Sequence, residues 1–522
     1  MPAQKADEEE KKAGDARNEE GEDLDKFGDD LMTKMMQEEA QSESNYVAEY
    51  NDVISEISKI CSIIMATNKN VQNATPLNEY EVVELCPRIT TLATEYRNLT
   101  SEDKERVFLE TLLKGCFSLL VIKSPVIALK VSNSNIHCFF KIFDLVVQKD
   151  PLTESTTDFK KVFNYLYETV RGLLIYAKEG KFDKMFMDEG LIPQLCYVIS
   201  KCFIEHGNPL LCDLLSTTVA NKQVRNDEKV LDLLNYTIGT IKCFTQSNKE
   251  VQIESVNNKM VTLLSLTISK ILEFNCSANR KAMILVQITG TLRNLANIDQ
   301  CHHQLAQGAI GKLCDIFFDQ NFSQGKELSL NIARLLSKVS LDYRCAEKIV
   351  KSGHIRGYLH SMVQHRESSA ILIRLAYILG NLTTNFEEAR QKLCERGSAT
   401  EKNSFLIITE LAVYYLEKDA QGATADSQPA EEQKQRSAGK NKYQEFTTGH
   451  LEDALTKVIK LLANLSTEEE VALDAFKEMK ELLSNFIGQV CEAVNRRNIE
   501  QNEEFILNAI SCVTNILYYD TA

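Results

Sequence analysis

An asparagine recurs four times in the C-terminal half of this sequence, each time between large apolar residues. The copies read Leu292-Arg293-Asn294-Leu295, Leu379-Gly380-Asn381-Leu382, Leu462-Ala463-Asn464-Leu465 and Val513-Thr514-Asn515-Ile516. A carboxamide has one acceptor and two donors, so it can pair with both the C=O and the N–H of an extended peptide. A row of such asparagines would bind a peptide backbone with little regard to its sequence. Alternatively, each asparagine bonds a neighbouring loop carbonyl and holds adjacent elements together.

The spacing of these asparagines indicates a repeat. Asn294 and Asn381 lie 87 residues apart, which is two periods of about 43. A weaker copy, Leu335-Leu336-Ser337, lies between them and has Ser337 where the asparagine is expected. Glycines interleave with the motif, and Gly308 and Gly353 fit the turn between the first two helices of a repeat. Apolar residues recur at helical spacing, which predicts an α-solenoid, a fold that mostly binds other macromolecules.

Composition and charge divide the chain into five predicted segments. Residues 1–45 hold 15 acidic and 6 basic side chains and little that is apolar, which predicts a disordered acidic tail. The other predicted segments are an N-terminal helical region at 46–155, armadillo-like repeats at 156–417, a polar disordered insertion at 418–449, and C-terminal helices at 450–522.

Bulk properties exclude several classes of protein. The net charge of −15 disfavours non-specific nucleic-acid binding. The 15 cysteines include no Cys-x-x-Cys pair and mostly lie in apolar helical runs, which is typical of reduced, buried thiols in an intracellular protein. No apolar run approaches the roughly 20 residues that span a bilayer. We therefore expect a soluble chain that binds neither nucleic acid nor membrane.

We find no constellation of residues that would support catalysis. The Gly-Lys pairs are not followed by Ser or Thr, so a phosphate-binding loop is absent, and there is no His-Glu-x-x-His sequence. Cys301-His302-His303 has no second cluster to complete a tetrahedral metal site. The sequence thus predicts a protein that is not an enzyme, with no cofactor, metal or small-molecule substrate.

Three stretches resemble the armadillo-repeat family, and within it a protein of motile cilia and flagella. They are Ile373–Thr383 followed by Ala389-Arg390, Lys460–Leu465, and Ile506–Ile510 running into Thr514–Tyr519. The resemblance covers roughly residues 285–522. It implies an all-α, armadillo/HEAT-like right-handed α-solenoid that acts as a non-enzymatic scaffold or adaptor in the cytoplasm and the axoneme of the cilium or flagellum. It further implies radial-spoke or central-apparatus components as partners, and cargo binding for intraflagellar transport.

A second interpretation is a soluble transport receptor or regulatory subunit, acting in nuclear import or on a small GTPase. Import adaptors usually pair tryptophan with asparagine on their groove, and this chain has no Trp. Its absence counts against nuclear import.

Two binding surfaces are predicted, the first from the resemblance and the second from the excess of apolar residues on the final helix. In armadillo proteins the third helix of each repeat lines a groove, which here would carry Asn294 and Asn381 flanked by Arg293, Arg334 and Arg374. Inward-facing arginines would select acidic or phosphorylated segments, whereas solvated arginines would select nothing. For Asn464 and Asn515 the structural interpretation is favoured. The second surface is a docking edge on the final helix, at Val513, Ile516 and Leu517.

Overall fold

The computed structural model describes most of the chain from residue 183 onward. The described residues are 183–188, 190–205, 220–322, 325–395, 402–425 and 448–520, with a few more between 55 and 62 and between 166 and 180. The chain divides into two compact units, and these helices belong to the one that comprises Leu152–Lys160 and Val170–Ala522. The predicted acidic tail at 1–45 and nearly all of the predicted region at 46–155 lie outside the described residues.

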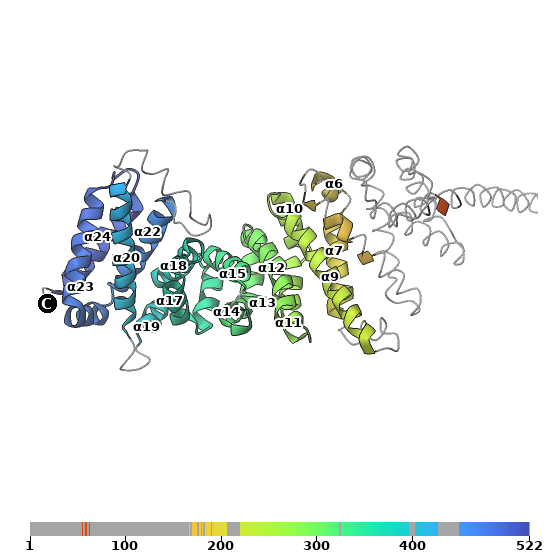
Figure 1. The fold of residues 1–522 in the computed structure, drawn as a ribbon, viewed down its shortest axis with the longest axis horizontal. Coiled ribbons are helices and arrows are strands. Elements are labelled where there is room, and N and C mark those ends of the chain that lie inside the picture. The colour runs from red at the N-terminus through yellow and green to blue at the C-terminus, as the bar shows by residue number, and fades with distance from the viewer. Residues whose placement is uncertain are drawn as a thin grey trace, which may run out of the picture. The chain divides into compact units, whose positions relative to one another are not determined.

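Every regular element of the described residues is a helix, as the apolar periodicity predicts (Figure 1). The first helices are α6 Asp183–Asp188, α7 Leu191–Ile199, a π-helical segment Ser200–Glu205, and α9 Ala220–Phe244. Three triplets follow: α10 Lys249–Asn257, α11 Met260–Glu273 and α12 Ala278–Leu295; α13 His302–Gly308, α14 Ile310–Phe318 and α15 Lys326–Val339; α16 Tyr343–Lys351, α17 Ile355–Gln364 and α18 Ser369–Asn385. The last helices are α19 Glu387–Cys394, α20 Ser404–Ala425, α22 Thr448–Leu465, α23 Glu469–Asn495 and α24 Glu503–Asp520.

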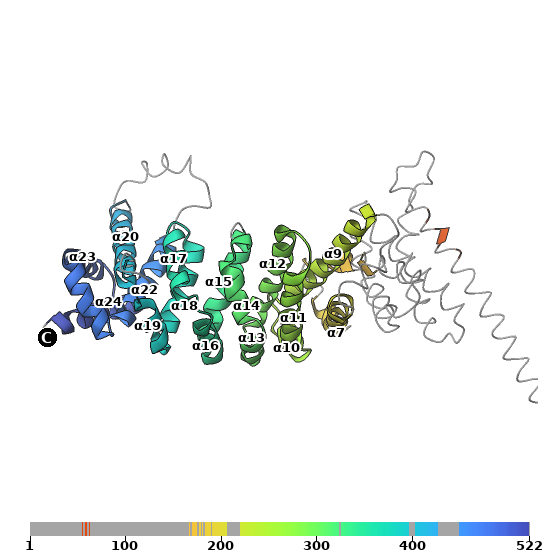
Figure 2. The ribbon, with the colours of Figure 1, turned by 90° about the horizontal axis from the view of Figure 1, so that it is seen from below.

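The helices stack in chain order, as in an α-solenoid. We call α9, α12, α15, α18, α22 and α24 the ladder helices, because each packs directly against the next of the set. In Figure 2, α10, α13 and α16 lie along the lower edge of this stack, with α12 and α15 above them. The predicted armadillo/HEAT-like architecture is therefore confirmed, and the C-terminal helices continue the same stack through the contact of α18 with α22.

Local sequence signals start and stop these helices. Asn248 begins α10 by accepting hydrogen bonds from the N–H groups of Glu250 and Val251, at 3.0 and 3.2 Å. Between α16 and α17, Gly353 has a φ of 79°, a conformation that costs a residue without Cβ very little. Gly308 ends α13, and a Cβ there would lie 2.8 Å from the Cβ of Ser265 on α11. Both glycines are at the predicted turns, one for its backbone conformation and the other for close packing.

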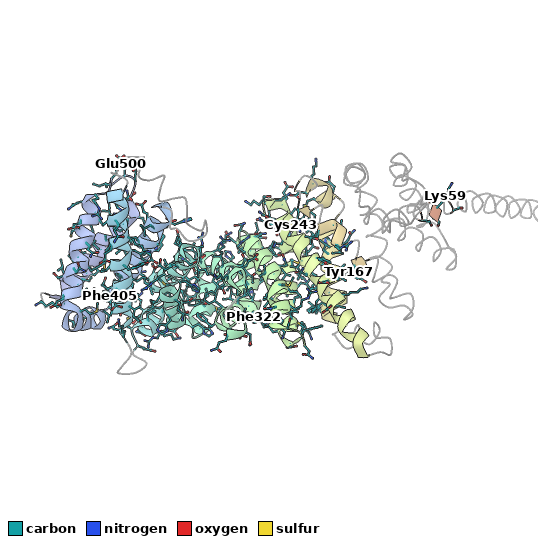
Figure 3. All side chains as sticks on the ribbon, viewed as in Figure 1. Lys59, Tyr167, Cys243, Phe322, Phe405 and Glu500 are labelled. Atoms are coloured by element: carbon teal, nitrogen blue, oxygen red, sulfur yellow. The ribbon has the colours of Figure 1, made fainter. Side chains whose placement is uncertain are left out.

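The leucines of the repeated tetrapeptide form the core between ladder helices. These residues are fully buried: Leu292, Leu295, Leu379, Leu382, Leu462 and Leu465. Figure 3 shows side chains filling the spaces between the helices, with Phe405 of α20 among them. The described cysteines are free thiols, and burial raises the pKa of the Cys512 thiol to about 12. Such thiols stay protonated and pack as small apolar groups.

The predicted insertion at 418–449 begins too early. α20 continues to Ala425, and its polar last turns are held by residues distant in sequence. Lys418 pairs with Glu367 at 2.9 Å, and Asp419 accepts from Arg497 at 2.8 and 3.1 Å. Polar composition suggested a loop here, but ion pairs with Glu367, between α17 and α18, and with Arg497, just after α23, make these residues part of the stack. Residues 426–447 lie outside the described residues. Among the described helices, none is both long and apolar enough to cross a bilayer.

The pair between Asp419 and Arg497 gives a first prediction. Arg497 is nearly buried, lies 4.4 Å from the centre of the Phe505 ring, and has a second carboxylate, that of Glu452, 3.6 Å from its Nε. We expect Asp419→Ala to lower the free energy of unfolding by about 2 kcal/mol, because Arg497 loses both of its hydrogen bonds to Asp419 and keeps only the more distant Glu452 as a counter-ion. Urea unfolding followed by circular dichroism measures the effect. As a contrast, replacing 426–447 by a short Gly-Ser linker should change stability little; the reverse order of effects would contradict this account.

Candidate functional site

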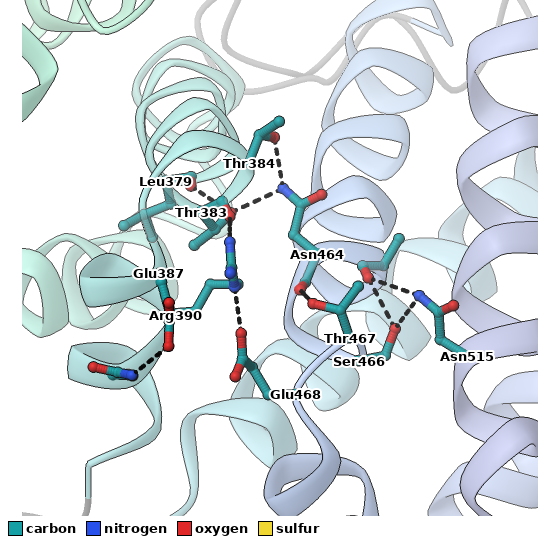
Figure 4. A network of polar contacts seen from close by, with 12 residues as sticks. Leu379, Thr383, Thr384, Glu387, Arg390, Asn464, Ser466, Thr467, Glu468 and Asn515 are labelled. Atoms are coloured by element: carbon teal, nitrogen blue, oxygen red, sulfur yellow. Dashed lines mark hydrogen bonds and ion pairs between the residues drawn. The ribbon is translucent and has the colours of Figure 1, made fainter. Parts of the chain in front are cut away.

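The asparagines of the repeated motif make hydrogen bonds between successive ladder helices. Asn464 of α22 donates through Nδ2 to the Gly380 carbonyl at 3.0 Å and to the Thr383 hydroxyl at 2.9 Å, both on α18. Figure 4 shows the bond to Thr383. Asn515 of α24 repeats the arrangement on α22, bonding the Ala463 carbonyl and the Ser466 hydroxyl, each at 3.2 Å (Figure 4). We call each such contact a rung.

The same rungs occur earlier in the stack. Asn294 of α12 donates to the Lys242 carbonyl at 3.0 Å and the Thr245 hydroxyl at 3.2 Å, at the end of α9. Asn381 of α18 donates to the Ser340 hydroxyl at 2.9 Å, just after α15. All four asparagines therefore reach a hydroxyl that lies at or just beyond the same turn of the preceding ladder helix.

Each accepting hydroxyl also donates its own proton in a hydrogen bond. The hydroxyls donate to carbonyls one turn earlier in their own helices: Thr245 to Ile241 at 2.8 Å, Ser340 to Ser337 at 2.9 Å, Thr383 to Leu379 at 2.8 Å and Ser466 to Ala463 at 2.9 Å. The oxygen is thus left with lone pairs that point out of its helix. A carboxamide N–H is the group that satisfies them, and each such neutral bond contributes about 0.5–1.5 kcal/mol.

The rungs show that the predicted register of α15 is wrong by one residue. The last turns of α12 and α15 end with equivalent backbone bonds, from Ala296 N to Leu292 O and from Ser340 N to Leu336 O. Asn294 lies two residues before Ala296, so the equivalent residue of α15, two before Ser340, is Lys338 and not Ser337. Lys338 then faces Ala296, the one accepting position of the described rungs that lacks a hydroxyl. It donates through Nζ to the Oδ1 of Asn297. Burial, followed by the charge of Arg293, lowers the pKa of Lys338.

These contacts are those of the stack-holding interpretation. Asn294 and Asn381 are only 6 and 7 % exposed, and their amide nitrogens bond within the stack. Asn464 and Asn515 make equivalent bonds, which agrees with the structural interpretation favoured for them. A peptide-binding role for Asn294 and Asn381 stays a prediction.

The predicted arginines lie on three consecutive ladder helices: Arg293 on α12, Arg334 on α15 and Arg374 on α18. Arg293 donates to Oδ1 of the buried Asn331 on α15 at 3.1 Å, so its guanidinium leans toward the next helix. Arg374 lies over the Tyr377 ring at 5.9 Å. Burial lowers the pKa of Arg334, and the charges of Arg293 and Arg374 lower it further. The structure therefore brings the three arginines together.

These arginines differ from most of the other described arginines, which pair with a carboxylate. Arg280, Arg344, Arg390 and Arg497 each pair with a carboxylate, respectively of Asp232, Asp342, Glu468 and Asp419. Within the described part of the chain, Arg293, Arg334 and Arg374 form no ion pair. We call these three residues the arginine row.

Two lysines that the sequence analysis missed extend the positive charge. Lys242 of α9 lies against Gly290 of α12, where an added Cβ would come 2.7 Å from its Cδ. Lys460 of α22 lies near Gly380 of α18 in the same way, at 3.9 Å. Positions can be counted from the asparagine position of each ladder helix. Lys242 then lies one residue before that position, as Arg293 does, and Lys460 lies four residues before it, as Arg334 does. The small residues beside them allow the lysine stems to lie flat across the neighbouring helix.

The predicted docking edge on α24 needs a correction. Ile516 is 1 % exposed, because it lies on the face of α24 that packs into the stack, and Val513 is half-buried. Leu517 is 46 % exposed, as predicted, and the other exposed apolar residues of this helix are Leu507, Ile510 and Tyr518. Periodicity showed that α24 has too much apolar surface for one face but did not show which face is covered. Docking at this edge stays a prediction, now for the exposed residues.

In the described residues, no three His, Cys, Asp or Glu side chains are arranged to hold a metal ion.

The fold and the rungs define an armadillo-like α-solenoid, and comparisons agree. The solved structure of the armadillo-repeat protein SYS-1 superposes with a TM-score of 0.51 at 11 % identity, covering 90 % of this chain and 84 % of that one. No protein-family profile matches the chain.

The chain is similar in sequence to armadillo repeat-containing protein 2. The Bos taurus protein is 25 % identical over 293 residues, which cover 54 % of this chain and 31 % of the relative. The Mus musculus protein is 24 % identical over 319 residues, covering 59 % and 33 %. The chain thus matches about a third of the length of these relatives. The resemblance inferred from the residues is confirmed.

A double-mutant cycle tests the rungs. We expect Asn464→Ala and Thr383→Val each to destabilise the stack and to couple by about 1 kcal/mol, because the first removes the donor and the second the acceptor of one bond. Urea unfolding of the four proteins gives the coupling energy. The control is Asn508→Ala, since Asn508 lies on a ladder helix but bonds only the Glu504 carbonyl of its own helix, at 2.7 Å. Additive effects would mean that the two side chains act independently.

The exceptional position at Lys338 allows a rung to be added. We expect Ala296→Ser with Lys338→Asn to stabilise the protein by about 0.5–1 kcal/mol more than the sum of the two single substitutions. The serine supplies the missing acceptor and the asparagine the missing donor. Differential scanning calorimetry of the single and double variants measures this. A double variant equal to the sum would show that the register proposed for α15 is wrong.

Proposed function

We propose that this protein is a non-enzymatic armadillo-repeat scaffold or adaptor for the assembly or stability of the ciliary axoneme. The observation that carries the proposal is its sequence similarity to armadillo repeat-containing protein 2. The matching stretches identified in the sequence lie on the ladder helices: Ile373–Thr383 on α18, Lys460–Leu465 on α22, and Ile506–Ile510 on α24. Partners in this role are radial-spoke or central-apparatus components, with the intraflagellar transport machinery as the carrier.

The architecture supports a scaffold for physical reasons. Asparagines on four of the ladder helices form the rungs, which hold these helices in register. The same helices carry the half-buried arginine row and its flanking lysines. A protein-interaction scaffold needs a rigid frame and an exposed, chemically distinct surface, and the stack supplies both.

The proposal is tested by fractionating cilia from cells that express the tagged, full-length protein at its native level. We expect the protein in the detergent-insoluble axoneme together with radial-spoke components, because a structural scaffold remains bound when the membrane and matrix are removed. Mass spectrometry of axonemes, with a soluble cytoplasmic protein as the background control, gives the measurement.

Two outcomes have distinct meanings. Recovery in the detergent-soluble fraction together with intraflagellar transport particles would assign the adaptor role within the same proposal. Absence from cilia, with the protein instead in the nucleus or bound to a small GTPase, would contradict the proposal and favour the transport or regulatory class.

A further inference from the structure

The arginine row is an unbalanced concentration of positive charge within an acidic protein. The whole chain has a net charge of −15, yet Arg293, Arg334 and Arg374 approach closely enough to affect one another and meet no carboxylate in the described residues. Like charges held together raise the free energy of the free protein. An anionic partner that pairs with them would remove this penalty on binding.

Part of the row is held in place by neutral side chains. Arg293 donates to Oδ1 of Asn331 at 3.1 Å and to Oδ1 of Asn294 at 3.4 Å. Both asparagines are more than nine-tenths buried, and Asn294 is itself fixed by its rung. These acceptors orient the guanidinium without neutralising it. The arrangement differs from that of Lys457 nearby, which is paired with Glu504.

The register of the rungs gives the row a direction. Arg293 lies one residue before its asparagine position, Arg334 four residues before Lys338, and Arg374 seven residues before Asn381. Each step along the stack thus moves back by three residues, or about 4.5 Å of helix. With packed helix axes about 8–10 Å apart, successive arginines are separated by roughly 10 Å. An extended peptide in the polyproline II conformation covers that distance in about three residues, and every third side chain then lies on the same face.

We propose that Arg293, Arg334 and Arg374 bind an extended acidic segment of a partner protein, which crosses α12, α15 and α18 and carries a Glu or Asp side chain at about every third residue. The planar guanidinium pairs with a carboxylate through two parallel hydrogen bonds, so three such contacts select both charge and spacing. Lys242 and Lys460 lie on the neighbouring ladder helices and extend the positive surface beyond α12 and α18. This inference deepens the proposed scaffold function and rests on it.

A carboxylate-bearing peptide fits this surface better than a nucleic acid does. A nucleic-acid surface needs broad positive charge to attract a uniform line of phosphates, and the chain as a whole is strongly acidic. The row instead offers three guanidinium groups in a narrow, stepped line. Short-range pairing with a few spaced carboxylates uses this arrangement fully.

The test uses the full chain and fluorescein-labelled peptides of about 12 residues in about 0.1 M salt, read by anisotropy. One peptide has glutamate at every third position, a second has glutamine there, and a third has phosphoserine. A short DNA duplex is the fourth ligand. We expect the glutamate peptide to bind, the glutamine peptide not to bind, and the affinity to fall as salt is raised. Equal binding of the glutamine peptide, binding of the phosphoserine peptide alone, or tighter binding of the duplex would each overturn the proposal.

Matched variants locate the binding surface. Arg293→Gln with Arg334→Gln and Arg374→Gln should weaken binding of the glutamate peptide at least about tenfold, because three charge pairs are lost together. Lys249→Gln with Lys270→Gln and Lys348→Gln removes the same charge from exposed positions on α10, α11 and α16, and should leave affinity within about twofold. An equal loss in both triple variants would show general electrostatic attraction and overturn the proposal.

A single substitution tests the same surface in case the triple arginine variant misfolds. Arg374→Gln removes a guanidinium that bonds no buried asparagine, and we expect it to weaken the peptide about threefold with an unchanged melting temperature. Failure of the peptide to bind, with normal recovery in axonemes, would reject the acidic-segment inference alone. Peptide binding by a protein absent from cilia would reject the axonemal role alone.

Discussion

The stack depends on the hydrogen bond from an asparagine carboxamide to a hydroxyl that itself donates to a carbonyl of its own helix. Apolar burial draws the ladder helices together but is non-directional, so it sets their distance better than their register. A rung sets the register, because a slip of one residue would leave the amide of Asn294 or Asn381 buried without a partner. Leaving such a group unpaired costs about 1–3 kcal/mol, and the penalty recurs at every rung.

The exception at Lys338 supports this account. The accepting position before it is Ala296, which has no hydroxyl, and the donor facing Ala296 is the one described donor that is not an asparagine. At this one place both partners differ from those of the other described rungs: the acceptor position has no hydroxyl, and the donor is a lysine. Lys338 spans to the exposed Asn297 instead, and its ammonium adds to the charge near Arg293. The same position thus weakens one buried contact and strengthens the positive surface.

Fixed register also places the exposed side chains. Since α12, α15 and α18 cannot slide past one another, the stepped positions of Arg293, Arg334 and Arg374 form a constant pattern and not an average over several. The small residues Gly290 and Gly380 lie where Lys242 and Lys460 cross the neighbouring helices. The binding properties that we propose follow from this frame, whereas the cellular role that we propose follows from similarity to a longer relative that the chain matches over about a third of its length.

The sequence by itself determined what depends on neighbours along the chain. The helical period and the turns at Gly308 and Gly353 were predicted, because each depends on spacing or backbone conformation between residues close together in the chain. Only the tertiary structure decided the rest. The partner of Asn294 is Thr245 on another helix, the register of α15 depends on contacts between repeats, and Ile516 is buried because α24 turns that face inward. The last turns of α20 have a loop-like composition but are helical, and within them Lys418 pairs with Glu367 and Asp419 with Arg497. Such contacts join residues about 50 to 80 positions apart, where local periodicity carries no information.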